Sequence, residues 1–127
     1  MRREELRQLE GDRVVSIGAH TVHHSILHKH SIDWQQQEIE SSRAYLEQLL
    51  NRPVDMFAYP FGAYCPETVP LVEQADFLCA CTTLEETLWK KTSPYEIPRF
   101  DVGNWSAEIF ERRILDWFKR GYRDYGE

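Results

Sequence analysis

The sequence contains no long hydrophobic run. No stretch approaches the roughly 18 consecutive apolar residues that a membrane-spanning helix requires, so we expect no membrane span. The N-terminus, residues 1–9, is charged and then amphipathic, without the apolar centre of a signal peptide. The chain therefore carries no recognisable export address, and its cellular location is left open.

Cysteine is also scarce, and negative charges outnumber positive ones. Three cysteines, Cys65, Cys79 and Cys81, are too few and of the wrong number for a disulfide framework. Cys79 and Cys81 lie two apart in an apolar run, where we expect small buried thiols on one face of a strand rather than a metal pair. The 15 Lys and Arg against 21 Asp and Glu give a net charge of −6, which argues against nucleic acid or an anionic membrane as partner.

The remaining composition is that of a folded globular chain. The 127 residues suffice for one modest core, and 42% hydrophobic with 28% charged residues is unlike a disordered segment. The sequence shows no internal repeat, linker or low-complexity stretch. A single domain over residues 1–127 is therefore predicted.

Segments with helical and strand patterns alternate along the chain. Helices are predicted over residues 3–10, 34–50, 66–74 and 106–119, and strands over 13–18, 55–59, 77–82 and 96–100. Asp33 is the expected N-cap of the second helix, with Gln36 as its capping-box partner. Alternation of this kind implies parallel βα units, hence an α/β fold. Four short strands are too few for a closed barrel, which needs about eight.

All five histidines lie in the polar, aperiodic segment after the first strand, residues 20–30, which is predicted as a loop. His20 and His24 are four apart, a spacing that on a helical turn brings two imidazoles to one metal ion. The alternative is an accidental cluster in a solvated loop. The position after a strand, where parallel α/β folds place ligands, favours a metal site on His20 and His24. His23 would face away, and His28 and His30 would be exposed.

Two further segments present groups that are suited to catalysis. A strand that runs into Pro60-Phe61-Gly62 presents main-chain N–H groups able to hold an oxyanion, although spacing alone favours a plain aromatic turn. Arg99 lies at the end of the last predicted strand, where by itself it indicates a surface salt bridge.

In their order along the chain, these segments resemble the polysaccharide deacetylases of carbohydrate esterase family 4. The resemblance rests on His-Thr-Val-His-His at 20–24, Phe-Ala-Tyr-Pro-Phe-Gly at 57–62 and Ile-Pro-Arg at 97–99. It implies a distorted β/α barrel and metal-dependent hydrolysis of N-acetyl groups on an amino-sugar polymer, or of O-acetyl groups on xylan. Members of the family are often exported or at the cell surface.

The resemblance also implies the metal ligands. His20 and His24 match the two histidines that bind a divalent metal, usually zinc. Thr21 matches the hydroxyl residue that braces the loop between them.

Catalytic and substrate contacts follow from the same resemblance. Phe61 matches the aromatic residue whose backbone N–H helps to hold the oxyanion, and Arg99 matches an arginine that orients the catalytic aspartate. Tyr59, Pro60 and Tyr64 are expected to contact the acetylated polysaccharide.

Two parts of the family pattern have no match here. Nothing in residues 1–18 resembles Thr-Phe-Asp-Asp, which supplies the general base and third ligand, and Asp12 precedes its strand instead of following it. No histidine after His30 is available as general acid. We therefore expect an N-terminally incomplete domain, a partial barrel lacking its first strands. Its isolated chain would be weak or inactive, and its unpaired edges would favour a homo-oligomer.

Two alternatives to an enzyme stay open. One is a non-catalytic carbohydrate-binding remnant with a vestigial metal site, in which Trp34, Tyr59, Tyr64 and Trp105 offer stacking faces. The other is an assembly module that completes its core with a second chain.

Overall fold

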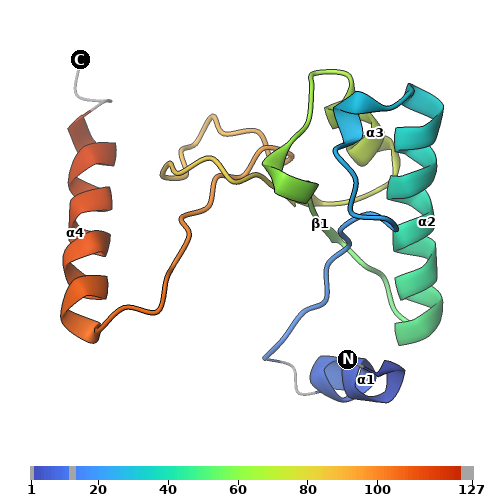
Figure 1. The fold of residues 1–127 in the computed structure, drawn as a ribbon, viewed down its shortest axis with the longest axis horizontal. Helices are drawn as coiled ribbons and strands as arrows, with labels where there is room; N and C mark the ends of the chain where they lie inside the picture. The colour runs from blue at the N-terminus through green and yellow to red at the C-terminus, as the bar shows by residue number, and fades with distance from the viewer. Residues whose placement is uncertain (1, 12–13, 124–127) are drawn as a thin grey trace.

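The computed structural model describes residues 2–11 and 14–123, and within them helices alternate with short strands (Figure 1). The elements are α1 (Arg3–Gly11), η1 (Leu27–Lys29), α2 (Ile32–Leu50), β1 (Met56–Ala58), η2 (Pro60–Gly62), α3 (Thr68–Gln74), β2 (Cys79–Cys81) and α4 (Ala107–Arg123). In these described ranges, no helix has both the length and the apolarity to cross a bilayer.

The strands pair in parallel, as the alternation predicted. β1 and β2 form a two-stranded sheet with Phe57 opposite Ala80. Single bridges continue the parallel pairing on both sides, from Ala19 to Phe57 and from Ile97 to Cys81. The architecture is a mixed α/β fold. Because the sheet of the described residues has two strands, the partial barrel stays a prediction.

The two outer strands were overpredicted. Residues 14–18 take no regular structure before the bridge at Ala19, Arg13 lies outside the described residues, and Ile97 bridges alone. Both of these outer segments are bridged to a neighbouring strand on one side, through Ala19 and Ile97. Val14 of the first segment is 90% exposed. Pro98 also lacks the N–H that a continuing ladder requires.

Helix α2 begins earlier than expected because its N-cap is Ser31 rather than Asp33. The Ser31 hydroxyl accepts the Trp34 N–H at 3.4 Å. Gln36 does not close a capping box but donates to Glu40 at 2.7 Å. The helix ends where Asn51 takes the left-handed conformation, with φ of 55°.

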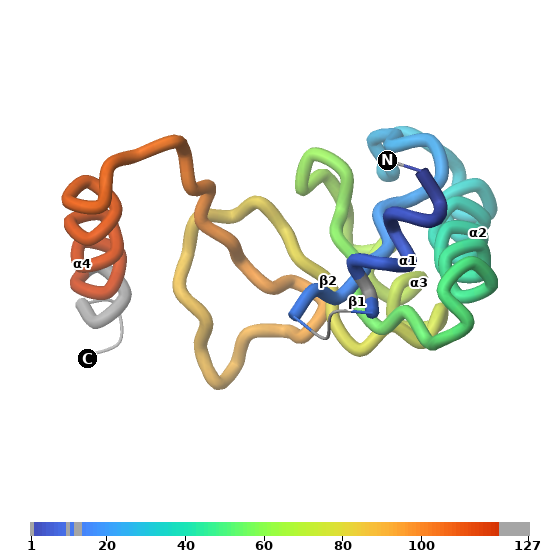
Figure 2. The backbone as a smooth tube through the Cα atoms, turned by 90° about the horizontal axis from the view of Figure 1, so that it is seen from below, coloured from blue at the N-terminus to red at the C-terminus, as the bar shows by residue number. Residues whose placement is uncertain are grey.

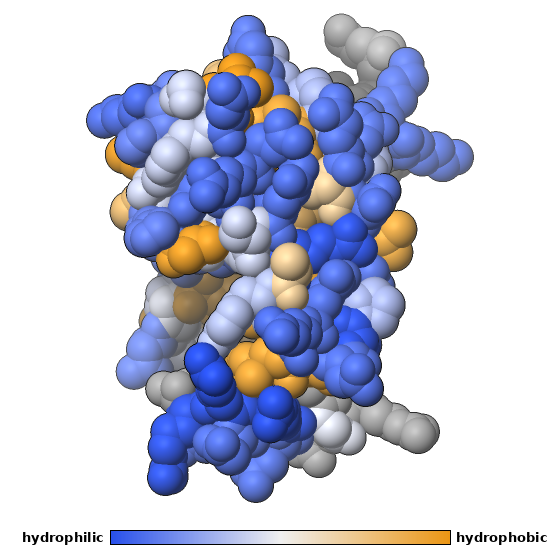
Figure 3. All heavy atoms as spheres, turned by 90° about the vertical axis from the view of Figure 1, so that its right-hand side faces the viewer, coloured by the Kyte–Doolittle hydropathy of each residue, from blue (hydrophilic) through white to orange (hydrophobic). Residues whose placement is uncertain are grey.

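The core lies between the strands and helices α2 and α3 (Figure 1). Its buried apolar members are Ala19, Leu27, Ile39, Val54, Phe57, Tyr59, Leu71, Val72, Ala75, Phe77 and Ala80. Phe57 contacts both Tyr59 and Phe77, with ring centroids 5.4 and 5.2 Å apart. The face of the molecule on the α2 side is mainly hydrophilic, with apolar side chains in small separate groups (Figure 3).

Alternation on β2 corrects the expectation for the cysteines. Ala80 is the residue that faces the core, and Cys79 and Cys81 share the opposite face, half-buried. Burial, then the neighbouring Cys81 and Asp55, raises the pKa of the Cys79 thiol.

Helix α4 stands apart from the other helices, across the strands from α2 in both views (Figures 1 and 2). It starts after Ser106, as predicted, and continues beyond the predicted end near residue 119. Trp117 stacks on Phe100 with centroids 3.9 Å apart. Much of its apolar side remains exposed, including Ile109, Phe110, Leu115 and Phe118.

Candidate functional site

The histidine loop and the aromatic turn meet at one edge of the sheet because both follow paired strand segments. The Ala19 N–H donates to Met56 O at 2.8 Å, and the Ala58 N–H donates to Ala19 O at 3.0 Å. His20 comes next, and its Nδ1 lies 2.7 Å from Ala58 O. A carbonyl only accepts hydrogen bonds, so Nδ1 carries a proton, and in the neutral imidazole Nε2 keeps a lone pair for a metal.

The loop itself is irregular rather than a helical turn. Thr21 and His24 both take left-handed conformations, with φ of 62° and 54°. The Thr21 hydroxyl accepts the His24 N–H at 3.0 Å, which braces the turn between the two histidines. The His20 and His24 rings lie with centroids 4.8 Å apart and planes at 58°. Proximity of the pair thus comes from the two left-handed residues and not from helical spacing.

A buried carboxylate that the sequence reasoning missed supports this loop. Glu38 of α2 is 4% exposed and accepts the N–H groups of Val22 and His23 at 3.0 and 2.8 Å. Its other oxygen is 2.7 Å from His23 Nδ1, so His23 is turned toward α2. Burial works to raise the Glu38 pKa, but the hydrogen bonds from His23 and Val22 outweigh it and hold the pKa below the ordinary value.

Phe61 brings the aromatic turn against the histidines. Its ring packs edge-on to His24 with centroids 4.6 Å apart and is 61% exposed. Phe61 and Gly62 both have positive φ, 59° and 64°. A Cβ at Gly62 would lie 2.8 Å from Thr83 N, so only glycine fits this close approach of two backbones.

Tyr59 and Pro60 lie in the core, and their assignment as substrate contacts stays a prediction. Tyr59 is 0% exposed and its hydroxyl donates to Tyr95 O at 2.9 Å, and Pro60 is also fully buried. Strand alternation explains this outcome, because Phe57 and Tyr59 point to the same buried side.

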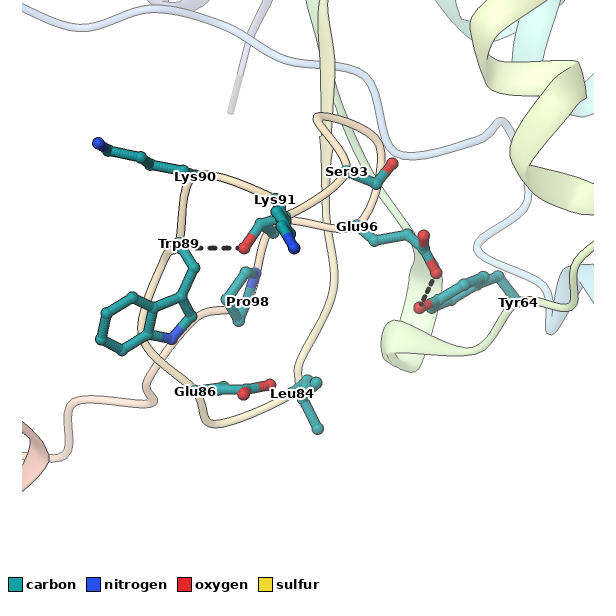
Figure 4. A pocket seen from close by; sticks show the side chains of 10 residues that line it. Tyr64, Leu84, Glu86, Trp89, Lys90, Lys91, Ser93, Glu96 and Pro98 are labelled. Carbon is teal, nitrogen blue, oxygen red and sulfur yellow. Dashed lines mark hydrogen bonds between the residues drawn. The ribbon is translucent and has the colours of Figure 1, made fainter. Parts of the chain in front are cut away.

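Tyr64 lies at a cavity of about 660 Å³ (Figure 4). Its ring stacks on Tyr59 with centroids 4.6 Å apart, and its hydroxyl donates to Glu96 at 2.9 Å. Burial and the hydrogen bond and charge of Glu96 raise the Tyr64 pKa to about 12. Leu84 and Trp89 line the same cavity, which offers apolar surface with polar groups at one side.

Strands β1 and β2 separate Arg99 from the histidines, because Arg99 follows the Ile97 bridge on the far side of β2. It is exposed, its Nε donates to Thr82 O at 2.8 Å, and its N–H donates to Leu84 O at 2.9 Å. It lines a depression together with Asp101. The guanidinium is thus held by main chain rather than by the surface salt bridge that the residue alone indicated.

The donor set of the site is a pair of histidines. Within residues 2–11 and 14–123, no group of three His, Cys, Asp or Glu side chains gathers as a metal shell. Asp12 lies outside these ranges. Two imidazoles, one of them fixed through Nδ1, suit a zinc ion that takes its other ligands elsewhere.

Several solved structures share the fold of this chain. The Streptococcus pyogenes deacetylase PplD, solved in complex with acetate, matches with a TM-score of 0.79 and 26% identity over 88% of this chain and 50% of that chain. A Bacillus cereus polysaccharide deacetylase matches with a TM-score of 0.81 and 22% identity, over 90% of this chain and 36% of that chain. A mutant of a CE4 family pseudoenzyme matches with a TM-score of 0.59 and 18% identity, over 92% of this chain and 48% of that chain. The chain therefore spans half or less of the length of each.

Sequence comparison assigns the family. No curated protein matches the chain. The family model described as polysaccharide deacetylase matches residues 1–80, more than half of the sequence. The chain therefore belongs to the polysaccharide deacetylase family.

Proposed function

We propose that this chain carries part of the active site of a metal-dependent deacetylase, which hydrolyses N-acetyl groups on an amino-sugar polymer. The observation that supports it most is the His20 and His24 pair, whose rings lie 4.8 Å apart beside the end of β1. We assign these two residues as ligands of a divalent metal, with zinc as the best fit to imidazole donors. The hydrogen bond from His20 Nδ1 to Ala58 O would orient the ring so that its other nitrogen can bind the metal.

The other residues of the site have separate roles in this proposal. A bound divalent ion polarises the acetyl carbonyl and lowers the pKa of water. The Phe61 N–H donates to the developing oxyanion, in a turn whose ring already contacts His24. The cavity at Tyr64 and Trp89 receives a neighbouring sugar. Arg99 orients a catalytic aspartate that the described residues do not supply.

Zinc titration of histidine variants tests the assignment. We expect His20→Ala and His24→Ala each to weaken zinc binding by at least about 100-fold, since each removes a direct ligand. His28→Ala and His30→Ala are the matched controls and should bind zinc like the original chain. Isothermal titration calorimetry provides the affinities, and equal losses in all four variants would contradict the assignment.

The isolated chain is proposed to be a weak deacetylase. Acid and base groups each contribute roughly 10²- to 10⁴-fold to such a hydrolysis, and neither has a match in this sequence. Acetate release from chitooligosaccharides should therefore stay near background with saturating zinc. Robust zinc-dependent release would instead show that the chain has its own base, with Asp12 and Asp101 as the first candidates.

A non-catalytic glycan-binding role is the second candidate. The absence of a third ligand side chain near the pair, among the described residues, favours it. In that case the chain would bind chitooligosaccharide without zinc, and Trp89→Ala in the Tyr64 cavity would abolish the binding. Zinc-dependent binding that His24→Ala abolishes would instead favour the enzyme.

A further inference from the structure

Glu38 connects α2 to the middle of the histidine loop. Glu38 is 4% exposed, and one of its carboxylate oxygens accepts two consecutive N–H groups, from Val22 and His23. The other oxygen lies 2.7 Å from His23 Nδ1. A buried carboxylate with three such partners strongly restrains the loop that holds them.

The restrained residues lie between two conformations that need support. Thr21 and His24 flank Val22 and His23, and both are non-glycine residues with positive φ. Such residues persist only where the surroundings hold them. The Thr21 hydroxyl contributes one bond across the loop, to the His24 N–H at 3.0 Å, and Glu38 contributes the contacts from outside it. Releasing Glu38 would therefore free the segment that sets the separation of the His20 and His24 rings.

We propose that Glu38 is a positioning residue for the metal site: through Val22 and His23 it holds residues 20–24 in the shape that brings the His20 and His24 imidazoles together. The inference rests on the proposed function of that histidine pair. It predicts that zinc affinity depends on a side chain that touches neither histidine ligand.

Two variants of Glu38 test this role in the full chain. Glu38→Ala removes all three bonds and should weaken zinc binding by about 10-fold or more, the range seen for residues that orient ligands. Glu38→Gln keeps one acceptor oxygen and should fold even if the alanine variant does not. Its zinc affinity should lie between that of the original chain and that of Glu38→Ala. Hydrogen exchange at the Val22 and His23 amides, measured without zinc, should become faster in the same order.

Glu47→Ala is the matched control. Glu47 is also a carboxylate of α2 that accepts a backbone N–H, that of Val54 at 3.0 Å, but at the other end of the helix. Its loss should lower the melting temperature and leave zinc affinity and the exchange of residues 22 and 23 unchanged.

The outcomes separate the two proposals. If both Glu38 variants match the original chain in zinc affinity and in the exchange of the loop amides, the role of Glu38 is overturned. The proposed function is not affected by that outcome. Equal losses of affinity in the Glu38 and Glu47 variants would also overturn the role of Glu38, because general destabilisation would then explain both. An original chain that binds no zinc would overturn the proposed function, and the exchange rates would then decide whether Glu38 holds the loop.

Discussion

The phenol of Tyr64 lies between the Tyr59 ring and the carboxylate of Glu96. Ionisation there would place a phenolate in a partly buried position beside a negative charge, and the Tyr64 pKa is accordingly raised to about 12. An unfolded chain ionises its tyrosines near pH 10. The stabilisation linked to this group is therefore complete below pH 10 and is lost as the pH rises toward 12.

Tyr64→Phe should change the stability in two ways. At pH 7 we expect the free energy of unfolding to fall by about 1 kcal/mol, because the hydrogen bond to Glu96 is lost. Between pH 10 and 12 the variant should lose less stability than the original chain. Urea unfolding followed by circular dichroism at several pH values measures both effects. Tyr45→Phe, at an exposed tyrosine, is the control, and parallel pH curves for the original chain and Tyr64→Phe would contradict the prediction.

Single residues of the site were predictable to different degrees. His20, His24 and Phe61 follow strand segments, and position after a strand was enough to bring them together. Tyr59 was assigned to the substrate from its aromatic motif, whereas strand alternation predicts the buried position that it takes. Glu38 was missed, although its helical spacing with the buried Gln35 and Ile39 signals an acid on the inner face of α2.

The turn η2 depends on the absence of a side chain at one position. Gly62 has φ of 64°, and a Cβ there would meet the Thr83 backbone nitrogen at 2.8 Å. Backbone atoms cannot move aside as the end of a flexible side chain can. The turn is therefore restricted both by conformation and by space.

Gly62→Ala should destabilise the chain by about 1–3 kcal/mol, since the left-handed conformation and the close approach both oppose a side chain. Gly11→Ala is the control, because nothing lies within 4 Å of a Cβ there, in the last turn of α1. That change should be neutral or stabilise by up to about 1 kcal/mol. Thermal unfolding compares the two, and a Gly62 variant as stable as the Gly11 variant would refute the restriction.

The four helices and the two central strands were predictable. β1, β2 and α2 lie near their expected positions because their apolar patterns are satisfied by the core. The outer strands failed because a strand pattern does not reveal whether a partner strand lies on both sides. Ser31 and Asp33 are both good N-caps, so composition could not choose between them.

At the scale of the whole molecule, α4 exposes apolar side chains that a folded helix normally buries. Phe118 is 69% and Leu115 51% exposed, and Phe110 is 40% exposed. Val14, in the segment without regular structure that precedes Ala19, is 90% exposed. Exposed apolar helix faces and open strand edges both favour association with another chain.

We therefore expect a homo-oligomer in solution. Sedimentation velocity at tens of micromolar, roughly the range for a weak interface, should show a dimer or larger species. Phe118→Lys should shift the distribution toward monomer, because it places a charge on the apolar side of α4. Asp116→Lys makes a like substitution on the polar side and serves as the control. A monomer throughout this concentration range would contradict the expectation.

The detached position of α4 also bears on the cooperativity of unfolding. The ring contacts of Trp117 with Phe100 and Trp105 lie within the last third of the chain, whereas α1, α2, α3 and the strands pack on one another. A protein divided in this way opens in sub-global units. In a monomer, the α4 amides would exchange at a lower free energy than those of α2, and a gentle rise in temperature would melt α4 before the rest of the chain.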